Sequence, residues 1–483
     1  MARSPGARAV RALDLPASGG SEWSYQALRD RATALADELA ATGVSAGAGV
    51  VLALPNSVEF ILHFLALARL GACVLLVSPR YGSTEVEAIA ARARPAFWIG
   101  RAGRSLLPSE TTWPVRARRD LGDGVQVVRC ETVGASPFDA SDAVVKFSSG
   151  STGEPKGVRL EASALLAEAE QVARTLDLAA RDRVVARVPL VHSYGFDLGL
   201  LAPLLNGAEL GVGEGFIPRL ALRELAGATI LLGVPSMYRL WLECGGSVSA
   251  PELRWALSCT APLAPETIGA VHRRFGLIIA AHYSASECGA ITNHRTTEVL
   301  GRPLSVGHPV HGVRLAVQDE AGRELPAGES GEIVVQSAAI ARGILGLSAA
   351  DAPISTAADG GRHYRTGDLG RLDADGFLTL EGRRDALINV GGLKVSPFEV
   401  EAVLESHPAV SEALARAERG RDGECYVIAL VVPRASTTEV ELREHCHGRL
   451  AEHKRPRRVE IVPQLPRSAG GKLDRRPVRE EGT

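Results

Sequence analysis

The alternation of helical and strand-like hydrophobic patterns through the first 300 residues constrains the fold of this 483-residue chain more than any other feature. The patterns follow one another as helix (25–39), strand (50–54), helix (59–70), strand (73–77), helix (84–92) and strand (96–99). Apolar strands that are separated by helices of this length predict a largely parallel sheet with helices on both faces. The first part of the chain is therefore predicted to be an α/β domain.

The alternation of helical and strand-like patterns ends at about residue 306. Short strand-like runs at 313–317, 331–336 and 377–381 are separated by turn signals, a pattern typical of an antiparallel lobe. The final segment combines two helical patterns with one strand-like run, at 397–404, 438–449 and 425–432. We therefore expect a large N-terminal domain over 1–384, with the antiparallel lobe at about 306–384, and a small α+β domain over 385–483.

The chemical composition narrows the possible partners. A formal net charge of −2, with 23% charged and 46% hydrophobic residues, indicates a globular protein without a nucleic-acid or anionic-membrane partner. The longest apolar stretch, 60–77, is interrupted by His63, Arg69 and Gly71, so it predicts a buried helix and no membrane span. Seven cysteines without a CxxC pair indicate neither a disulfide framework nor a zinc site. With no secretory signal evident, we expect a cytoplasmic protein.

The stretch FSSGSTGEPKG (147–157) follows a likely strand with four hydroxyls, three glycines and one lysine. Glycines let backbone N–H groups turn inward, and hydroxyls with an ammonium complete a concave site for phosphate. The spacing does not fit a Walker loop, because Lys156 is followed by Gly157 and not by a hydroxyl residue. The alternative is a solvated linker. Only five lysines stand among the 54 basic residues, yet two of them, Lys156 and Lys472, lie in Gly-rich loops.

Three more polar stretches carry candidate chemistry. HYSASEC (282–288) follows an apolar run and contributes Glu287 as a possible ligand of Mg²⁺. YRTGDLG (364–370) is expected to place Asp368 in a tight turn, where it could bind a ribose. PRSAGGK (466–472) adds a cation near the chain end. Together with the phosphate loop, these stretches predict a nucleotide-dependent enzyme.

The chain resembles the adenylate-forming superfamily of acyl- and aryl-CoA synthetases, stand-alone adenylation domains and luciferases. The resemblance is carried in sequence order by the four stretches above and by GACVLLVSPRYGSTEVE (71–87), VPLVHSYGFDLG (188–199), ILLGVPSMYRL (230–240), LSCTAPL (257–263), GESGEIVVQS (328–337) and GRRDALINVGGLKVSPFEVE (382–401). It implies layered, mostly parallel sheets in the large domain and a mobile C-terminal domain on a hinge at Asp385. It also implies a two-step reaction with ATP, Mg²⁺ and a thiol, either CoA or the phosphopantetheine of a carrier protein.

The resemblance also assigns roles to individual residues. Lys472 is implied as the catalytic residue of the first step, with Glu287 on Mg²⁺ and His192 between ATP and the acyl group. The implied cofactor-binding residues are Ser148, Ser149, Gly150, Ser151, Thr152 and Lys156 for phosphate, Ser286 beside them, Thr260 and Tyr283 for adenine, Asp368 and Arg383 for ribose, Gly391 and Gly392 on the thiol side, and Lys394. The implied substrate pocket consists of Ser193, Tyr194, Gly233, Met237 and His282.

The substrate and the acceptor stay open at this point. Amino-acid-activating relatives carry an aspartate where this chain reads His192-Ser193-Tyr194-Gly195, and Asp197 lies a few residues on, where it could face elsewhere. An aryl or short acyl acid is therefore favoured over an α-amino acid, and CoA over a carrier protein. A silent nucleotide-binding homologue is a remote alternative, because Lys156, Glu287, Asp368 and Lys472 are all present.

Overall fold

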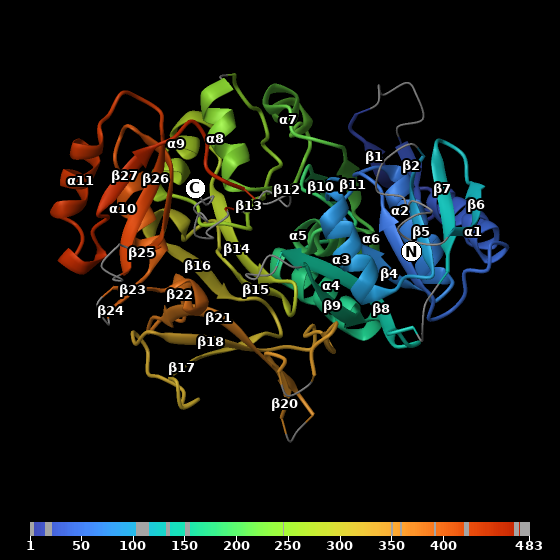
Figure 1. The fold of residues 1–483 in the computed structure, drawn as a ribbon. Coiled ribbons are helices and arrows are strands. Elements are labelled where there is room, and N and C mark those ends of the chain that lie inside the picture. The colour runs from blue at the N-terminus through green and yellow to red at the C-terminus, as the bar shows by residue number, and fades with distance from the viewer. Residues whose placement is uncertain are drawn as a thin grey trace.

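The computed structural model describes residues 4–14, 22–102, 115–131, 136–149, 155–244, 246–348, 351–357, 360–390, 393–419, 425–467 and 473. Two large mixed sheets form most of the molecule (Figure 1). Their parallel parts come from the apolar runs that the sequence alternates with helices.

The smaller of these sheets carries the predicted phosphate loop. Its order is β19 (Gly343–Ile344), β9 (Pro155–Glu161), β8 (Asp142–Ser149), β4 (Cys73–Leu76), β3 (Gly49–Ala53), β5 (Phe97–Arg101), β7 (Val125–Cys130) and β6 (Val115–Asp120). Strands β8, β4, β3 and β5 are parallel to one another, whereas β9 and β7 run antiparallel to their neighbours. The hairpin of β8 and β9 therefore brings the two ends of the 147–157 stretch together.

The larger sheet joins the α/β part to the antiparallel lobe. Its order is β17 (Arg314–Gln318), β18 (Gly331–Gln336), β21 (Arg362–Leu372), β22 (Leu378–Arg383), β16 (Ser305–Pro309), β15 (Gly289–Asn293), β14 (Ile279–Ala285), β13 (Trp255–Ser258), β12 (Ile230–Gly233), β10 (Arg183–Ala186), β11 (Glu209–Val212), β1 (Arg8–Ala12) and β2 (Glu22–Ser24), with β20 (Ile354–Thr356) on β21. Pairing is parallel from β1 to β14 and antiparallel from β14 to β17.

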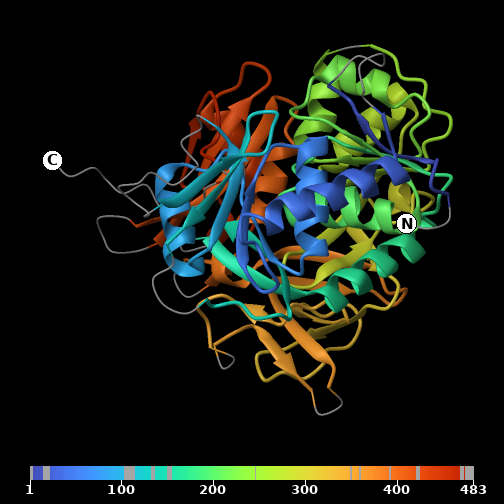
Figure 2. The ribbon, with the colours of Figure 1, turned by 90° about the vertical axis from the view of Figure 1, so that its right-hand side faces the viewer.

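Helices fill the space between the two sheets and cover their outer faces. One core joins both sheets to α1 (Tyr25–Ala40), α2 (Val58–Arg69), α4 (Ala162–Leu176), α5 (Ser193–Phe196), the π-helix η1 (Asp197–Leu201) and α6 (Ala202–Asn206), and Figure 2 shows α1 between the sheets. Helix α3 (Ser83–Ala93) covers the outer face of the smaller sheet, and α7 (Pro218–Glu224), α8 (Pro235–Cys244) and α9 (Pro265–Phe275) cover that of the larger. Ser24 and Ser57 begin α1 and α2 because their hydroxyls accept hydrogen bonds from Ala27 and Phe60 N–H groups.

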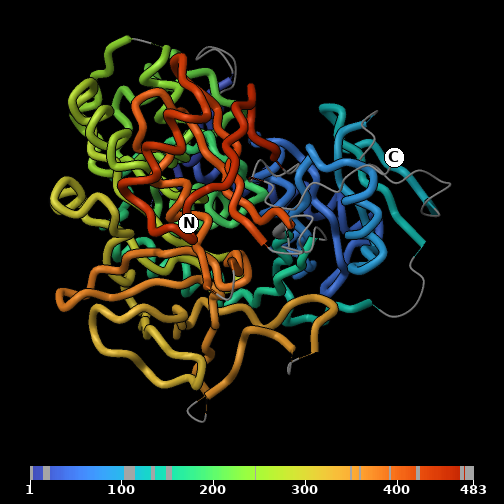
Figure 3. Tube along the Cα trace, turned by 60° about the vertical axis from the view of Figure 1, so that its left-hand side comes forward, coloured from blue at the N-terminus to red at the C-terminus, as the bar shows by residue number. Residues whose placement is uncertain are grey.

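The C-terminal part has a separate core and lies against α8 (Figure 3). It comprises the turn η3 (Arg384–Ala386), β23 (Ile388–Val390), β24 (Leu393–Val395), α10 (Pro397–Glu405), β25 (Val410–Arg419), β26 (Cys425–Pro433), α11 (Glu439–His447), η4 (Glu452–Lys454) and β27 (Arg458–Ile461). The Arg239 guanidinium on α8 donates to the Glu412 carboxylate on β25 at 2.6 Å. Glu412 also accepts from Arg467, five residues before Lys472.

The predicted fold class is confirmed, with two corrections in detail. The 364–370 stretch is not a tight turn: it lies within β21, where Arg365 and Leu369 pair with β18 on either side of a register shift and Gly367 has a φ of +72°. Strand β14 also continues through Ala285 and takes up half of HYSASEC, because its antiparallel pairing with β15 extends it. The division of the domains at residues 384 and 385 stays a prediction. Within the part of the chain that the structure describes, no helix has the length and apolarity of a membrane span.

Candidate active site

The phosphate-loop residues lie at the carboxyl end of β8. Ser148 pairs with Lys156 and Ser149 with Pro155 across the β8–β9 hairpin. The side chains of Ser148 and Ser149, and Gly150, Ser151 and Thr152 entirely, lie outside the described part of the chain. A hydrogen bond from Arg383 is the main cause that lowers the pKa of Asp385, and the positive charge of Lys156 lowers it further.

Tyr283, Asp368 and Arg383 form one hydrogen-bonded group. The Tyr283 hydroxyl donates to Oδ2 of Asp368. Arg383 lies opposite Asp368 in the β21–β22 pair, and its Nη1 donates to Oδ1 of Asp368 at 3.2 Å and to the Thr366 carbonyl oxygen at 3.1 Å. Gly367 has a φ of +72°, and an added Cβ there would lie 3.3 Å from Nη2 of Arg383, so glycine leaves room for the guanidinium. Burial raises the pKa of Asp368, although Tyr283 and Arg383 oppose this.

The turn between β14 and β15 meets α5. The Ser193 hydroxyl on α5 and the Ser286 hydroxyl on the turn are 2.7 Å apart. Glu287 is partly exposed, and its backbone carbonyl accepts a hydrogen bond from Ala341 N–H at 2.8 Å. Burial and, next, the Glu287 charge raise the pKa of the Tyr364 hydroxyl on β21.

The donor set fits Mg²⁺ as a partner of substrate phosphates. Among the described residues, no group of three His, Cys, Asp or Glu side chains gathers to hold a metal. Mg²⁺ commonly takes one or two carboxylates from the protein and further oxygens from phosphate and water. A single accessible carboxylate, Glu287, beside the Ser286 hydroxyl is consistent with that mode of binding.

Aromatic side chains surround the predicted acyl pocket. The rings of Tyr194 and His282 lie 5.7 Å apart at an interplanar angle of 28°. The Tyr238 hydroxyl donates to the Leu257 carbonyl at 2.6 Å, and a Cβ at Gly233 would lie only 2.7 Å from that hydroxyl. Only glycine at position 233 leaves room for Tyr238, a packing role that the sequence alone did not predict. Met237 on α8 is partly buried against the main core.

His192 and Thr260 occupy special backbone positions. His192 directly precedes α5 in an extended conformation, and its carbonyl accepts from Phe196 N–H at 2.8 Å. Thr260, which follows β13, is exposed with a φ of +77°. A β-branched residue in the left-handed region is strained, and such strain concentrates at functional sites.

The predicted residues near the hinge are only partly described. Asp385 lies in η3 and pairs with Arg383 at 3.0 Å. Lys394 is exposed and pairs with Glu320 on the β17–β18 turn at 3.3 Å, which places it outside the group around Asp368. Gly391, Gly392 and Lys472 lie outside the described residues.

A buried charged cluster was missed as part of the site. Nζ of Lys146 on β8 donates to both carboxylate oxygens of Asp197 on η1, at 2.6 and 2.7 Å, and both side chains are 3% exposed. Oε1 of Glu168 on α4 accepts from Ala290 N–H at 2.9 Å. Burial and, next, the charge of Asp197 raise the pKa of Glu168 to about 8, so this carboxyl is protonated at neutral pH.

The cluster ties together three predicted site segments. Lys146 directly precedes the phosphate-loop stretch, Asp197 follows the acyl-pocket residues, and Ala290 follows Glu287 by three residues. The Asp197 carboxylate is therefore taken up by Lys146. A lysine within an apolar strand of a chain with only five lysines was the available signal.

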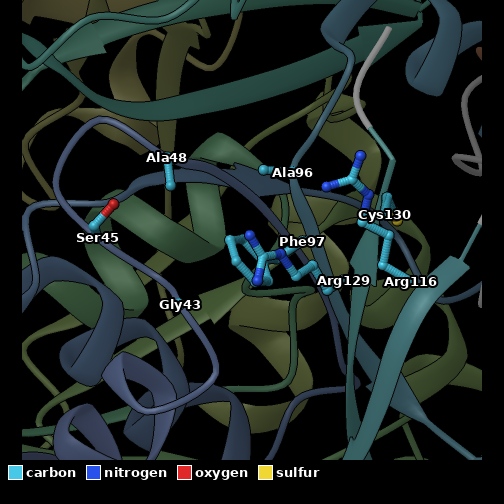
Figure 4. Close-up of a pocket in the computed structure, with 8 residues that line it drawn as sticks. All are labelled: Gly43, Ser45, Ala48, Ala96, Phe97, Arg116, Arg129 and Cys130. Carbon is cyan, nitrogen blue, oxygen red and sulfur yellow. The ribbon is translucent and has the colours of Figure 1, made fainter.

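A cavity of about 240 Å³ lies away from these residues (Figure 4). It is lined by Gly43, Ser45, Ala48, Ala96, Phe97, Arg116, Arg129 and Cys130. Several of these residues directly precede β3 and β5, at the amino ends of the parallel strands. The phosphate-loop stretch begins at the carboxyl end of β8 in the same sheet, so the cavity and the candidate active site lie at opposite ends of the parallel strands.

Comparison with known proteins agrees with this arrangement. A sequence profile described as "AMP-binding enzyme" matches residues 1–345, and one described as "AMP-binding enzyme C-terminal domain" matches residues 399–472. The chain belongs to the AMP-binding enzyme family. It is similar to a probable CoA ligase, CCL9, from Humulus lupulus (30% identity, covering 96% of this chain and 92% of that protein) and to an oxalate–CoA ligase from Arabidopsis thaliana (30%, 96% and 95%).

A solved structure gives the same result for the fold of this AMP-binding enzyme. An ATP-bound RpMatB-BxBclM chimera superposes with a TM-score of 0.85 at 25% identity, covering 98% of this chain and 95% of that one. The C-terminal profile ends at residue 472, so the position of the predicted catalytic lysine lies within the family match.

Proposed function

We propose that this AMP-binding enzyme activates a short carboxylic acid with MgATP and transfers the acyl group to CoA. The observation that carries the proposal is the hydrogen-bonded group of Tyr283, Asp368 and Arg383, with the Ser193–Ser286 pair at the turn that follows Tyr283. The names of the two relatives, both CoA ligases, support CoA as the acceptor.

The first step joins the acid to AMP. One carboxylate oxygen of the acid attacks the α-phosphorus of ATP, the bond to the bridging oxygen breaks, and pyrophosphate leaves with that electron pair. Asp368 accepts hydrogen bonds from the ribose hydroxyls, while Arg383 and Tyr283 hold its carboxylate in place. Lys472 stabilises the negative charge that develops between the carboxylate and the α-phosphate. Glu287 and Ser286 are the residues that would hold Mg²⁺, which neutralises phosphate charge when bound.

The second step forms the thioester. The CoA thiolate attacks the acyl carbon of the acyl-AMP, and AMP leaves with the electrons of the broken anhydride bond. We propose that the C-terminal domain turns about Asp385 so that Lys472 leaves and Gly391-Gly392 borders the thiol path. The ion pair of Arg239 on α8 with Glu412 on β25 joins the two parts of the chain in this structure, so such a turn would break it.

The space around the acyl position supports a short acid. Tyr194, His282 and Tyr238 are all buried, and the missing side chain of Gly233 is needed for the fit with Tyr238. A long chain would have to displace these rings, whereas a short acyl or single-ring acid requires less room.

Product analysis tests the proposed acceptor. The enzyme is incubated with MgATP and a panel of short, aryl and long-chain acids, each with CoA, with a phosphopantetheinylated carrier protein, or with neither. An acyl-CoA product detected by mass spectrometry supports the proposal. Acyl-AMP that accumulates in the presence of CoA but is consumed by the carrier protein would make a carrier the acceptor instead.

A further inference from the structure

Two buried polar groups at the predicted acyl pocket are not fully partnered among the described residues. One is Nε2 of His282, and the other is the Tyr194 hydroxyl, whose oxygen faces the Gly233 backbone N–H but whose proton has no acceptor among the described residues. The two side chains belong to residues that are 4% and 5% exposed, and their rings are stacked. A buried polar group that stays without a partner is costly, so such groups point to an occupant that satisfies them.

The hydrogen-bond network assigns the proton on His282. Nδ2 of Asn293 donates to the His294 carbonyl oxygen at 3.2 Å, so Oδ1 is the Asn293 atom that faces the ring. Oδ1 lies 3.2 Å from Nδ1 of His282 and can only accept a hydrogen bond. Nδ1 therefore carries the proton, and Nε2 presents a lone pair.

The charge state of the two groups agrees with this assignment. Burial lowers the pKa of His282 to about 4, so the ring is neutral at physiological pH. Burial also holds the pKa of the Tyr194 hydroxyl well above its ordinary value, so the phenol keeps its proton. The pair therefore offers one acceptor, Nε2, and one donor, the Tyr194 hydroxyl.

We infer that the pocket selects a short carboxylic acid that carries a hydrogen-bond donor, such as a hydroxyl group, away from its reacting carboxylate. A hydroxyl can donate to Nε2 of His282 and accept from the Tyr194 hydroxyl at the same time. A second carboxylate or a sulfonate offers acceptors only and would face the Nε2 lone pair. The inference rests on the proposed function and predicts a substrate unlike oxalate.

Matched acids test the inference. The acids form two sets, propanoate with 3-hydroxypropanoate and malonate, and benzoate with 2-hydroxybenzoate, 3-hydroxybenzoate and phthalate. ATP–pyrophosphate exchange is measured for each acid. The hydroxyl member of at least one set is expected to exceed its parent and its dicarboxylate in kcat/KM by about 10-fold to 100-fold, the effect of a buried hydrogen bond left unmade.

Two variants test whether His282 is responsible. His282→Phe removes the acceptor and is expected to abolish the preference for the hydroxyl acid over its parent. Asn293→Asp places a carboxylate on Nδ1, which favours the protonated ring and turns Nε2 into a donor. This variant is expected to shift the preference toward the dicarboxylate.

A control variant distinguishes the loss of the His282 acceptor in the acyl pocket from the loss of any buried histidine. His63 on α2 is also buried, with Nδ1 2.7 Å from the Glu59 carbonyl and with Nε2 unpaired among the described residues, but it does not lie at the predicted acyl position. His63→Phe should therefore leave the acid preference unchanged. Exchange with only the parent or the dicarboxylate acids in the wild type, or an unchanged preference in His282→Phe that folds, would overturn the inference. If no acid of any kind supports exchange, the proposed function itself fails.

Discussion

The Tyr283 hydroxyl donates a hydrogen bond to the Asp368 carboxylate, and so links β14 to β21 at the centre of the candidate active site. The two residues stand 85 positions apart in the sequence and share no local pattern. Strands β15, β16 and β22 lie between β14 and β21 in the sheet, so strand pairing alone does not bring the two residues together. Asp368 receives its second hydrogen bond from Arg383 on the neighbouring strand.

Tyr283→Phe should raise the KM for MgATP more than it lowers kcat. The variant leaves a buried carboxylate with one fewer donor, and hydrogen bonds to charged groups contribute about 1.5–3 kcal/mol, so we expect a KM increase of about 10-fold to 100-fold. Initial rates across MgATP concentrations measure this. Tyr25→Phe removes a buried hydroxyl that bonds to the Ala208 carbonyl at 2.8 Å, far from the site, and should change stability only. An unchanged KM in Tyr283→Phe would remove this residue from the nucleotide site.

Variants of the Lys146–Asp197 pair should show whether it only stabilises the fold or also positions the phosphate loop. Lys146→Met leaves the Asp197 carboxylate buried without its partner, and we expect a loss of about 3–5 kcal/mol in the free energy of unfolding. The double variant Lys146→Met/Asp197→Leu has no unpaired charge and should recover most of that loss. If the pair positions the phosphate loop, kcat stays low in the double variant. Recovery of both Tm and kcat would show a purely structural role.

Glu168 should make stability depend on pH. Its pKa is raised to about 8 in the folded protein from an ordinary value near 4.5, so the folded state holds the proton more tightly than the unfolded state. The stability from the protonated form is full below about pH 4.5 and is lost as the pH rises to about 8. Glu168→Gln cannot ionise and should lack this decline. Tm measured from pH 5 to pH 9 for both proteins tests the prediction, and parallel curves would contradict it.

Gly289→Ala should be much more destabilising than an ordinary substitution at a positive φ. Gly289 has a φ of +73°, and a Cβ there would lie 2.0 Å from Oε2 of Glu168. Gly122 has a φ of +92° with nothing within 4 Å of an added Cβ, so Gly122→Ala carries the backbone strain alone. We expect about 1–2 kcal/mol for Gly122→Ala and more than about 3 kcal/mol for Gly289→Ala in urea unfolding. Equal losses would mean that Glu168 moves away freely.

Local patterns in the sequence predicted most of the fold, because helices and parallel strands carry their signal in adjacent residues. Helix α1 ends within one residue of its prediction, and β18 has the bounds expected from the sequence. The position of Asp368 within a long strand was missed, because it depends on pairing with Arg383 of β22 and not on a local pattern.

For the candidate active site, too, local patterns were informative and contacts between distant residues were not predictable. Motifs indicated candidate residues, which stay a prediction, but contacts between distant segments could not be predicted from the motifs. Lys146, Asp197 and Glu168 come from three elements, and only the folded structure shows that these side chains lie close together. The donor role of Nδ1 in His282 likewise depends on Asn293 in the next strand.

ATP–pyrophosphate exchange in the wild type and in Lys472→Ala tests the central claim most directly. We predict that at least one short acid supports exchange in the wild type, and that Lys472→Ala lowers this rate by about 100-fold or more, because the charge at the α-phosphate loses its stabilising cation. Calorimetric titration with MgATP confirms that the variant still binds nucleotide. The account is contradicted if no acid supports exchange, or if Lys472→Ala is as active as the wild type.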